Sequence, residues 1–301
     1  MQEKERGWQG KTGGGNFGQK FLISLFKYVD IRFGYFLVYM VVPFYIILGI
    51  KRSKWTYIYF RKRLNYGVIK SLLSVYKNYC LFGQMMLDRF LLYTNSFDKV
   101  KCDIIGHEHI LKRLSRKNGF MSVSSHVGNF EISGYLNSQD LKRINVVVYG
   151  GESETIMSNR RKVLNKNNID LISVDNKMSH IFRINEVINN GEILYLSGDR
   201  NAGLGKIEDR MFLGKNTKFP IGAYKIALRY GLDILAMHVV KTSWNRYKIY
   251  VKPIYIKEND TLEEPESKKI DRMLDNYINE LEGILSKYPL QWFNFYNFWN
   301  D

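Results

Sequence analysis

A histidine and a glutamate lie five positions apart in the segment Ser-Ser-His-Val-Gly-Asn-Phe-Glu, residues 124–131. The apolar run at 119–124 is typical of a buried strand, so His126 is expected at its carboxyl end, where open α/β sheets place ligands. We expect Val127 onward to open a helix, with Glu131 about one turn from the ring. Such a pair can serve as general base and orienting carboxylate. The spacing equally suits a histidine that caps a helix beside a surface carboxylate.

A histidine base of this kind can take a proton from a bound hydroxyl or amine as that group attacks an activated carbonyl. The protein then needs no nucleophile of its own, and the sequence contains no G-x-S-x-G elbow around Ser124 or Ser125. Asn129 is a candidate donor to the developing oxyanion.

Asp199 and Arg200 follow a second predicted strand, residues 193–196, and are expected to border the same cleft. Arg200 could bind a phosphate or carboxylate of the acceptor, and Arg160, on a predicted helix, is a second candidate for that role. A loop salt bridge and a solvated helix face are the alternatives. His107 and His109 have no third ligand cluster beside them, so we expect no metal.

The elements that must position these residues follow from β-branched runs that alternate with helical patterns beyond residue 100. This alternation predicts an α/β fold with a mixed, partly parallel sheet flanked by helices. The predicted strands cover residues 102–105, 120–124, 144–149, 170–174, 193–196, 234–240 and 247–256. Helices are expected within 58–94 and over 270–288. The tail at 291–299 holds six aromatic residues, which suit either a core lid or a membrane interface.

Residues 33–50 carry no charge and are followed by Lys51, Arg52 and Lys54. This is about the minimum length for spanning a bilayer, although a buried core helix is an alternative. We therefore expect a flexible lead-in at 1–20, a membrane-anchoring helix region at 21–52 and one catalytic domain at 53–301.

The net charge of +16 suits an anionic partner such as a membrane surface. Nucleic acid is disfavoured, because the charge is spread along the chain and no recognised module appears. Two cysteines without metal spacing or a disulfide framework favour a reducing compartment, the cytoplasm.

The His-x-x-x-x-Glu spacing after an apolar strand resembles the first motif of the glycerolipid acyltransferase superfamily. Within it, the chain is similar to the lipid A biosynthesis acyltransferase family, the late lauroyl and myristoyl transferases. Residues 196–203, Leu-Ser-Gly-Asp-Arg-Asn-Ala-Gly, and 212–222 resemble that family's second block, and 288–292, Tyr-Pro-Leu-Gln-Trp, its terminal motif. Arg200 stands where the family usually has Gln, and the tail lacks the usual His-Arg-Arg element, so the acceptor's identity stays open.

The resemblance implies an acyltransferase with His126 as general base and Glu131 as its partner. It implies an acyl-carrier-protein thioester as co-substrate, with no cofactor and no metal. The acceptor would be a hydroxyl or amine of a glycolipid such as a lipid A precursor, at the bacterial inner membrane with the catalytic domain facing the cytoplasm. Substrate-binding positions are expected at Asn129, Arg160, Asp199, Arg200 and Gly203.

Two alternatives stay open from the sequence. One is an acyltransferase for another acceptor, such as an aminolipid, a lysophospholipid or an aryl-polyene or flexirubin-type lipid. The other is a non-catalytic, basic, membrane-associated lipid-binding protein.

Overall fold

A computed structural model of the 301-residue chain describes residues 29–93, 100–129, 132, 142–149, 161, 164–165, 168–174, 179–200, 205–260 and 263–301. The predicted lead-in at 1–20 and the first part of the anchoring region lie outside these residues. The division of the chain into a lead-in, an anchor and a catalytic domain stays a prediction.

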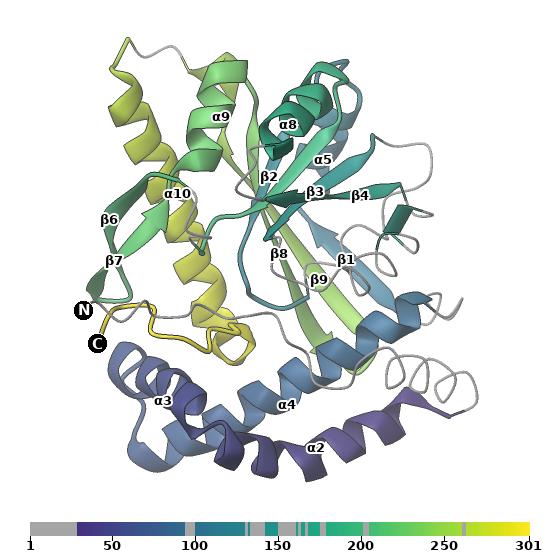
Figure 1. The fold of residues 1–301 in the computed structure, drawn as a ribbon, viewed down its shortest axis with the longest axis vertical. Helices are drawn as coiled ribbons and strands as arrows, with labels where there is room; N and C mark the ends of the chain where they lie inside the picture. Colours follow the sequence, from purple (N-terminus) through teal and green to yellow (C-terminus); the bar gives the residue numbers. More distant parts are fainter. Residues whose placement is uncertain are drawn as a thin grey trace.

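A seven-stranded sheet forms the centre of the fold, in the order β1-β9-β8-β2-β5-β3-β4 (Figure 1). Every neighbouring pair is parallel except β8 and β9. The prediction of a mixed, partly parallel α/β sheet is confirmed, and each of the seven predicted runs is a strand. The strands are β1 Lys101–Ile105, β2 Met121–Ser124, β3 Ile144–Tyr149, β4 Ile169–Val174, β5 Ile193–Ser197, β8 Ile234–Ser243 and β9 Arg246–Tyr255.

Successive side chains of a strand point to opposite faces of the sheet, so the apolar residues of the strands pack into two separate cores, one on each face. Met121 of β2 packs with the buried residues of α10, whereas Phe120, one residue earlier, packs on the side of α5. The covering helices are α5 His107–Leu114, α8 Ser179–Asn189, α9 Gly222–Tyr230 and α10 Glu266–Lys287, with short 3-10 helices η3 Lys257–Asn259 and η4 Pro289–Gln291.

A small antiparallel hairpin, β6 Ile207–Phe212 and β7 Lys215–Pro220, lies apart from the main sheet. This hairpin was not among the predicted strands, because its two runs, Ile-Glu-Asp-Arg-Met-Phe and Lys-Asn-Thr-Lys-Phe-Pro, are rich in charged and polar residues. Leu213 and Gly214 at its turn both have positive φ, as a tight two-residue hairpin requires.

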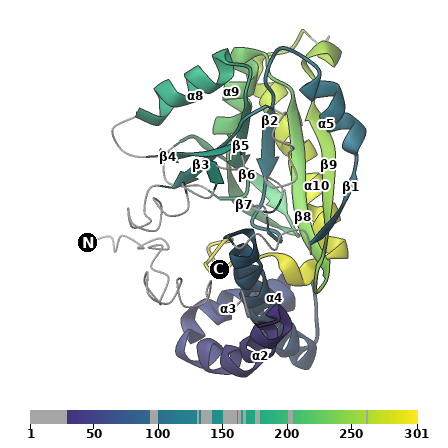
Figure 2. The ribbon, with the colours of Figure 1, turned by 90° about the vertical axis from the view of Figure 1, so that its right-hand side faces the viewer.

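Three α-helices form a separate layer beneath the sheet, as Figures 1 and 2 both show. They are α2 Ile31–Leu48, α3 Ile50–Ile58, which runs on into the π-helical turn η1 Tyr59–Arg63, and α4 Val68–Tyr93. In the part of the chain that the structure describes, α2 is the one helix long and apolar enough to cross a membrane. It is not a buried core helix, since only Ile31, Gly34, Tyr35 and Val42 are buried.

The aromatic C-terminal tail closes the space between the helical layer and the sheet. Trp292, Phe298 and Trp299 are buried, and the Trp292 ring lies 5.0 Å from that of Tyr59 and 5.6 Å from that of Phe212. Of the two alternatives for the tail, the core lid is therefore confirmed.

Candidate active site

His126 and Asp199 meet because their strands are parallel neighbours. In the register of β2 and β5, Ser124 lies opposite Ser197, the last residue of each strand. The two following loops therefore leave the same edge of the sheet side by side. His126 Nδ1 lies 2.7 Å from Asp199 Oδ1, and the His126 backbone N–H donates to Asp199 Oδ2 at 2.9 Å.

Asp199 accepts hydrogen bonds from two further groups. Ser197 Oγ donates to Asp199 Oδ1 at 2.8 Å, and the Trp292 indole N–H donates to Oδ2 at 3.1 Å. The carboxylate is only 1% exposed, so its hydration is replaced almost wholly by these donors. It is a fixed acceptor rather than a mobile side chain.

Burial pushes the pKa of Asp199 upward, but His126 and Arg200 outweigh it and hold that pKa well below its usual range. An ionised carboxylate can only accept, so the His126 Nδ1 must carry the proton that it donates. The Nε2 of His126 then has the free lone pair. Burial and the charge of Arg200 lower the pKa of His126 despite the opposing pull of Asp199. The ring is therefore neutral at pH 7, 28% exposed, and suited to act as a base.

The loop after His126 is held by the C-terminal tail and by β8. Gly128 N–H donates to the Gln291 carbonyl at 2.8 Å, and Phe293 N–H donates to the His126 carbonyl at 3.0 Å. Gly128 has φ +67°, and a Cβ there would stand 1.8 Å from the Val239 carbonyl oxygen. Only glycine fits so close to the sheet.

The predicted helix start at Val127 is wrong for residues 127–129. Val127 and Gly128 instead form isolated bridges to Trp292 and Val239. The physical reason is the tail: it supplies backbone partners from more than 160 residues away that local sequence cannot reveal. Ile132 is helical.

Asn129 is fully buried beside His126. Its backbone N–H donates to the Val239 carbonyl, and its Nδ2 donates to the Met85 carbonyl of α4 at 3.3 Å. In the structure Asn129 thus ties the His126 loop to the helical layer. Donation to an oxyanion stays a prediction.

Arg200 lies at the same edge of the sheet as expected, and its charge acts on both His126 and Asp199. Its guanidinium donates to the Phe293 carbonyl at 2.6 Å and lies 5.5 Å from the Tyr296 ring centroid. Among the described residues, no carboxylate forms a salt bridge with it. A cation is thus held next to the base by the tail.

Three of the predicted site residues, Glu131, Arg160 and Gly203, lie outside the described residues, and their roles stay predictions. The sequence assigned the carboxylate partner of His126 to Glu131. In the structure, Asp199 holds the ring nitrogen Nδ1. Asp199 was expected at the cleft, but its contact with His126 and the contribution of Trp292 were not predicted.

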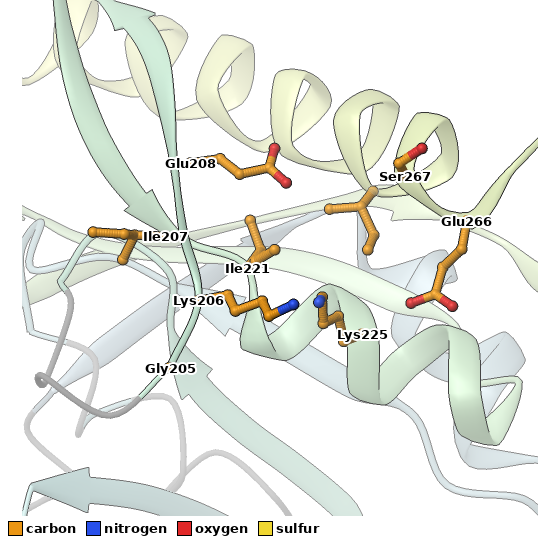
Figure 3. Close-up of a pocket in the computed structure, with 9 residues that line it drawn as sticks. Gly205, Lys206, Ile207, Glu208, Ile221, Lys225, Glu266 and Ser267 are labelled. Carbon is orange, nitrogen blue, oxygen red and sulfur yellow. The ribbon is translucent and has the colours of Figure 1, made fainter.

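A pocket of about 430 Å³ lies elsewhere, between the start of β6, α9 and the first turn of α10 (Figure 3). Lys206 and Lys225 point into it, while Glu208 at its rim pairs with Arg210 at 2.8 Å. Neither His126 nor Asp199 lines this pocket. It is therefore separate from the histidine–carboxylate pair.

Comparison with known proteins places the chain in a family. The family model for bacterial lipid A biosynthesis acyltransferases matches residues 74–301. No curated protein matches the chain. Among solved structures, it is similar to the 1-acyl-sn-glycerophosphate (LPA) acyltransferase PlsC from Thermotoga maritima, at 14% identity and a TM-score of 0.39, over 88% of this chain and 98% of that one. The matched residues hold His126, Asp199 and Trp292, and the chain belongs to the bacterial lipid A biosynthesis acyltransferase family.

Proposed function

We propose that this acyltransferase moves a fatty acyl chain from an acyl-carrier-protein thioester to a hydroxyl or amine of a glycolipid such as a lipid A precursor. The reaction takes place at the cytoplasmic face of the bacterial inner membrane. The observation that supports this most directly is the neutral His126 ring, held through Nδ1 by the buried Asp199 carboxylate.

In the proposed reaction, His126 Nε2 removes the proton of the acceptor hydroxyl as its oxygen attacks the thioester carbonyl carbon. Asp199 stabilises the imidazolium that forms, and its four fixed donors prevent it from turning away. The tetrahedral intermediate then collapses, the carbon–sulfur bond breaks, and the imidazolium returns its proton to the leaving thiolate. No protein nucleophile and no cofactor enter these steps.

Groups around the His126 ring stabilise the negative charge of the reacting molecules. Arg200 is a cation next to His126 and favours the developing oxyanion or an acceptor phosphate. We propose Asn129, Arg160 and Gly203 as further substrate-binding positions. We also propose that Glu131 is a second carboxylate of the site and contributes to catalysis together with Asp199.

The net positive charge of the chain indicates which partners it binds. An excess of 16 positive charges favours both an anionic membrane surface and an acidic carrier protein. Lys206 and Lys225 both line the pocket between β6, α9 and α10, and among the described residues neither forms an ion pair. They are candidates for contact with the acidic carrier.

The test is acyl transfer by the detergent-purified protein, with a radiolabelled myristoyl or lauroyl carrier-protein thioester as donor and inner-membrane lipid extract as acceptor. Mass spectrometry of the product separates a lipid A precursor from an aminolipid, a lysophospholipid or a polyene lipid. His126→Ala should lower the rate at least about 10³-fold, whereas His109→Ala on the surface of α5 should not change it. Full activity of a folded His126→Ala variant would refute the mechanism.

A further inference from the structure

The helix α2 presents a broad apolar surface away from the protein. Phe36, Met40, Phe44, Ile47 and Leu48 are all exposed, Leu48 to 88%. The start of α4, a helix that packs against α2, exposes four more apolar side chains, Val68, Ile69, Leu72 and Leu73. So many exposed apolar side chains on two packed helices are typical of contact with another apolar phase.

The N-terminal end of α2 is attached to the catalytic domain. The Tyr35 hydroxyl donates to Asp88 of α4 and lies 3.1 Å from the Trp244 carbonyl in the β8–β9 turn. Asp88 in turn pairs with Lys241 of β8, and both are buried. The Arg32 guanidinium lies 5.0 Å from the Trp244 ring centroid.

The C-terminal end of α2 is attached to the same domain. After Gly49 the chain continues as α3 and η1, whose residues Thr56, Tyr59 and Phe60 are buried. The Tyr59 hydroxyl donates to the Pro289 carbonyl at 3.2 Å, beside the tail that holds His126. Both ends of an 18-residue helix therefore return to one body.

Between its ends, α2 packs against α4 along its length. Val38 touches Gly83 so closely that a Cβ there would stand 2.7 Å from a Val38 methyl, and Gln84 donates to the Tyr39 hydroxyl at 2.9 Å. The other side of α4 is bound to the domain, with Asn78 donating to the Leu290 carbonyl at 2.8 Å. Helix α4 thus lies between α2 and the catalytic domain, as both ribbon views show (Figures 1 and 2).

From these contacts we infer that α2 does not cross the bilayer but lies in its plane, with its outer face and the first turns of α4 inserted into one leaflet. A spanning α2 would carry α4 with it and place the Asp88–Lys241 pair within the hydrocarbon region, where charges are costly. The in-plane position keeps that pair inside protein. This inference deepens the membrane location in the proposed function and does not depend on its chemistry.

The partner of this surface is a lipid leaflet with anionic headgroups. Lys51, Arg52 and Lys54 follow α2 directly and are exposed, and Lys70 is exposed among the apolar residues of α4. Lysine and arginine at the edge of an apolar helical face lie at headgroup level and bind anionic lipid. A second protein would not need this basic rim beside so apolar a face.

Cysteine labelling tests the inference directly. Val29→Cys and Lys51→Cys flank α2 at its two ends and are made singly in a Cys102→Ser background, in which Cys80 is buried. A membrane-impermeant maleimide is applied to spheroplasts and to inverted inner-membrane vesicles. We expect both positions to react from the same side, in the inverted vesicles only. Reaction of the two positions from opposite sides would overturn the inference.

The same vesicles separate this inference from the proposed function. If both cysteines react from one side and acyl transfer is absent, the in-plane position stands and the proposed function fails. If acyl transfer is present and the cysteines react from opposite sides, the proposed function stands and the in-plane position fails.

A charge inserted into the outer face provides a second test. Phe44→Glu should lower binding to phosphatidylethanolamine–phosphatidylglycerol vesicles about tenfold or more, because Phe44 is 68% exposed on the inserted face. Phe182→Glu is the matched control, since Phe182 is 80% exposed on α8, at the far end of the domain from α2 (Figure 1). It should bind as the wild type does. Equal binding of the Phe44→Glu variant would overturn the inference.

Discussion

Replacing Asp199 by asparagine is the sharpest perturbation of the proposed site. The change keeps the size of the side chain and removes its charge. An amide at this position can donate to His126 Nδ1, which favours the tautomer with the proton on Nε2, the nitrogen that must act as base. The variant therefore loses both the correct tautomer and the stabilisation of the imidazolium.

The magnitude follows from the same contact in other histidine–carboxylate pairs. Loss of the carboxylate there lowers kcat by roughly 10⁴-fold, and a range of about 10² to 10⁴ corresponds to roughly 3 to 5 kcal/mol of transition-state free energy. The amide oxygen retains some of the four hydrogen bonds, so the fold should survive. We expect kcat for transfer from the acyl-carrier-protein thioester to fall within this range, with little change in KM.

Asp233→Asn is the matched control for the loss of a buried carboxylate. Asp233 is nearly as buried and pairs with Arg113 and Arg116 at 3.1 and 3.3 Å, near α5 and away from His126. Its replacement should lower the melting temperature while the folded protein keeps its kcat. A folded Asp199→Asn variant that retains more than about a third of the wild-type kcat would refute the role of Asp199.

Three further predictions concern pH and the His126 loop. The pKa of His126 is lowered below its ordinary 6.5, so the base is neutral at pH 7. In a pH profile, kcat/KM should therefore fall on the acid side only below pH 6.5. An inflection above pH 6.5 would contradict the assignment of His126 as the general base. Burial lowers the pKa of His238 in the folded protein to about 4. As the pH falls, the imidazole therefore binds a proton in the unfolded chain before it does so in the folded protein. The free energy of unfolding should decrease between about pH 6.5 and pH 4, by up to roughly 3 kcal/mol. Denaturant titrations should show this loss in the wild type and a weaker one in His238→Gln; equal curves would exclude it. Gly128→Ala should cost roughly 2 kcal/mol or more and lower kcat, because its methyl group collides with a strand carbonyl at positive φ; a stable, fully active variant would contradict the loop geometry.

Local pattern was enough to predict the seven strands of the main sheet and the position of His126. The runs that become β3 and β5, Ile-Asn-Val-Val-Val-Tyr and Ile-Leu-Tyr-Leu-Ser, are short and rich in β-branched, aromatic and other apolar residues, which favour buried strands. The hairpin of β6 and β7 escaped prediction because its strands carry charged residues and half-exposed faces.

The aromatic tail and the uncharged N-terminal run each allowed two interpretations. Composition shows that such side chains avoid water, and a protein core satisfies that requirement as well as lipid does. Only the contacts of Trp292 with Tyr59 and Phe212 assign the tail to the core. Only the attachment of both ends of α2 to one domain distinguishes a helix that lies along the membrane from one that crosses it.

By itself, the sequence determined that His126 follows a buried strand and that Asp199 follows another. It could not determine that these strands are neighbours, because more than 70 residues separate them and sheet order depends on how the whole chain packs. The tertiary structure decided it by aligning Ser124 with Ser197 and bringing Trp292 from the tail. A carboxylate in the same sequence segment was the natural partner to predict, whereas the observed partner of His126 Nδ1 comes from the adjacent parallel strand.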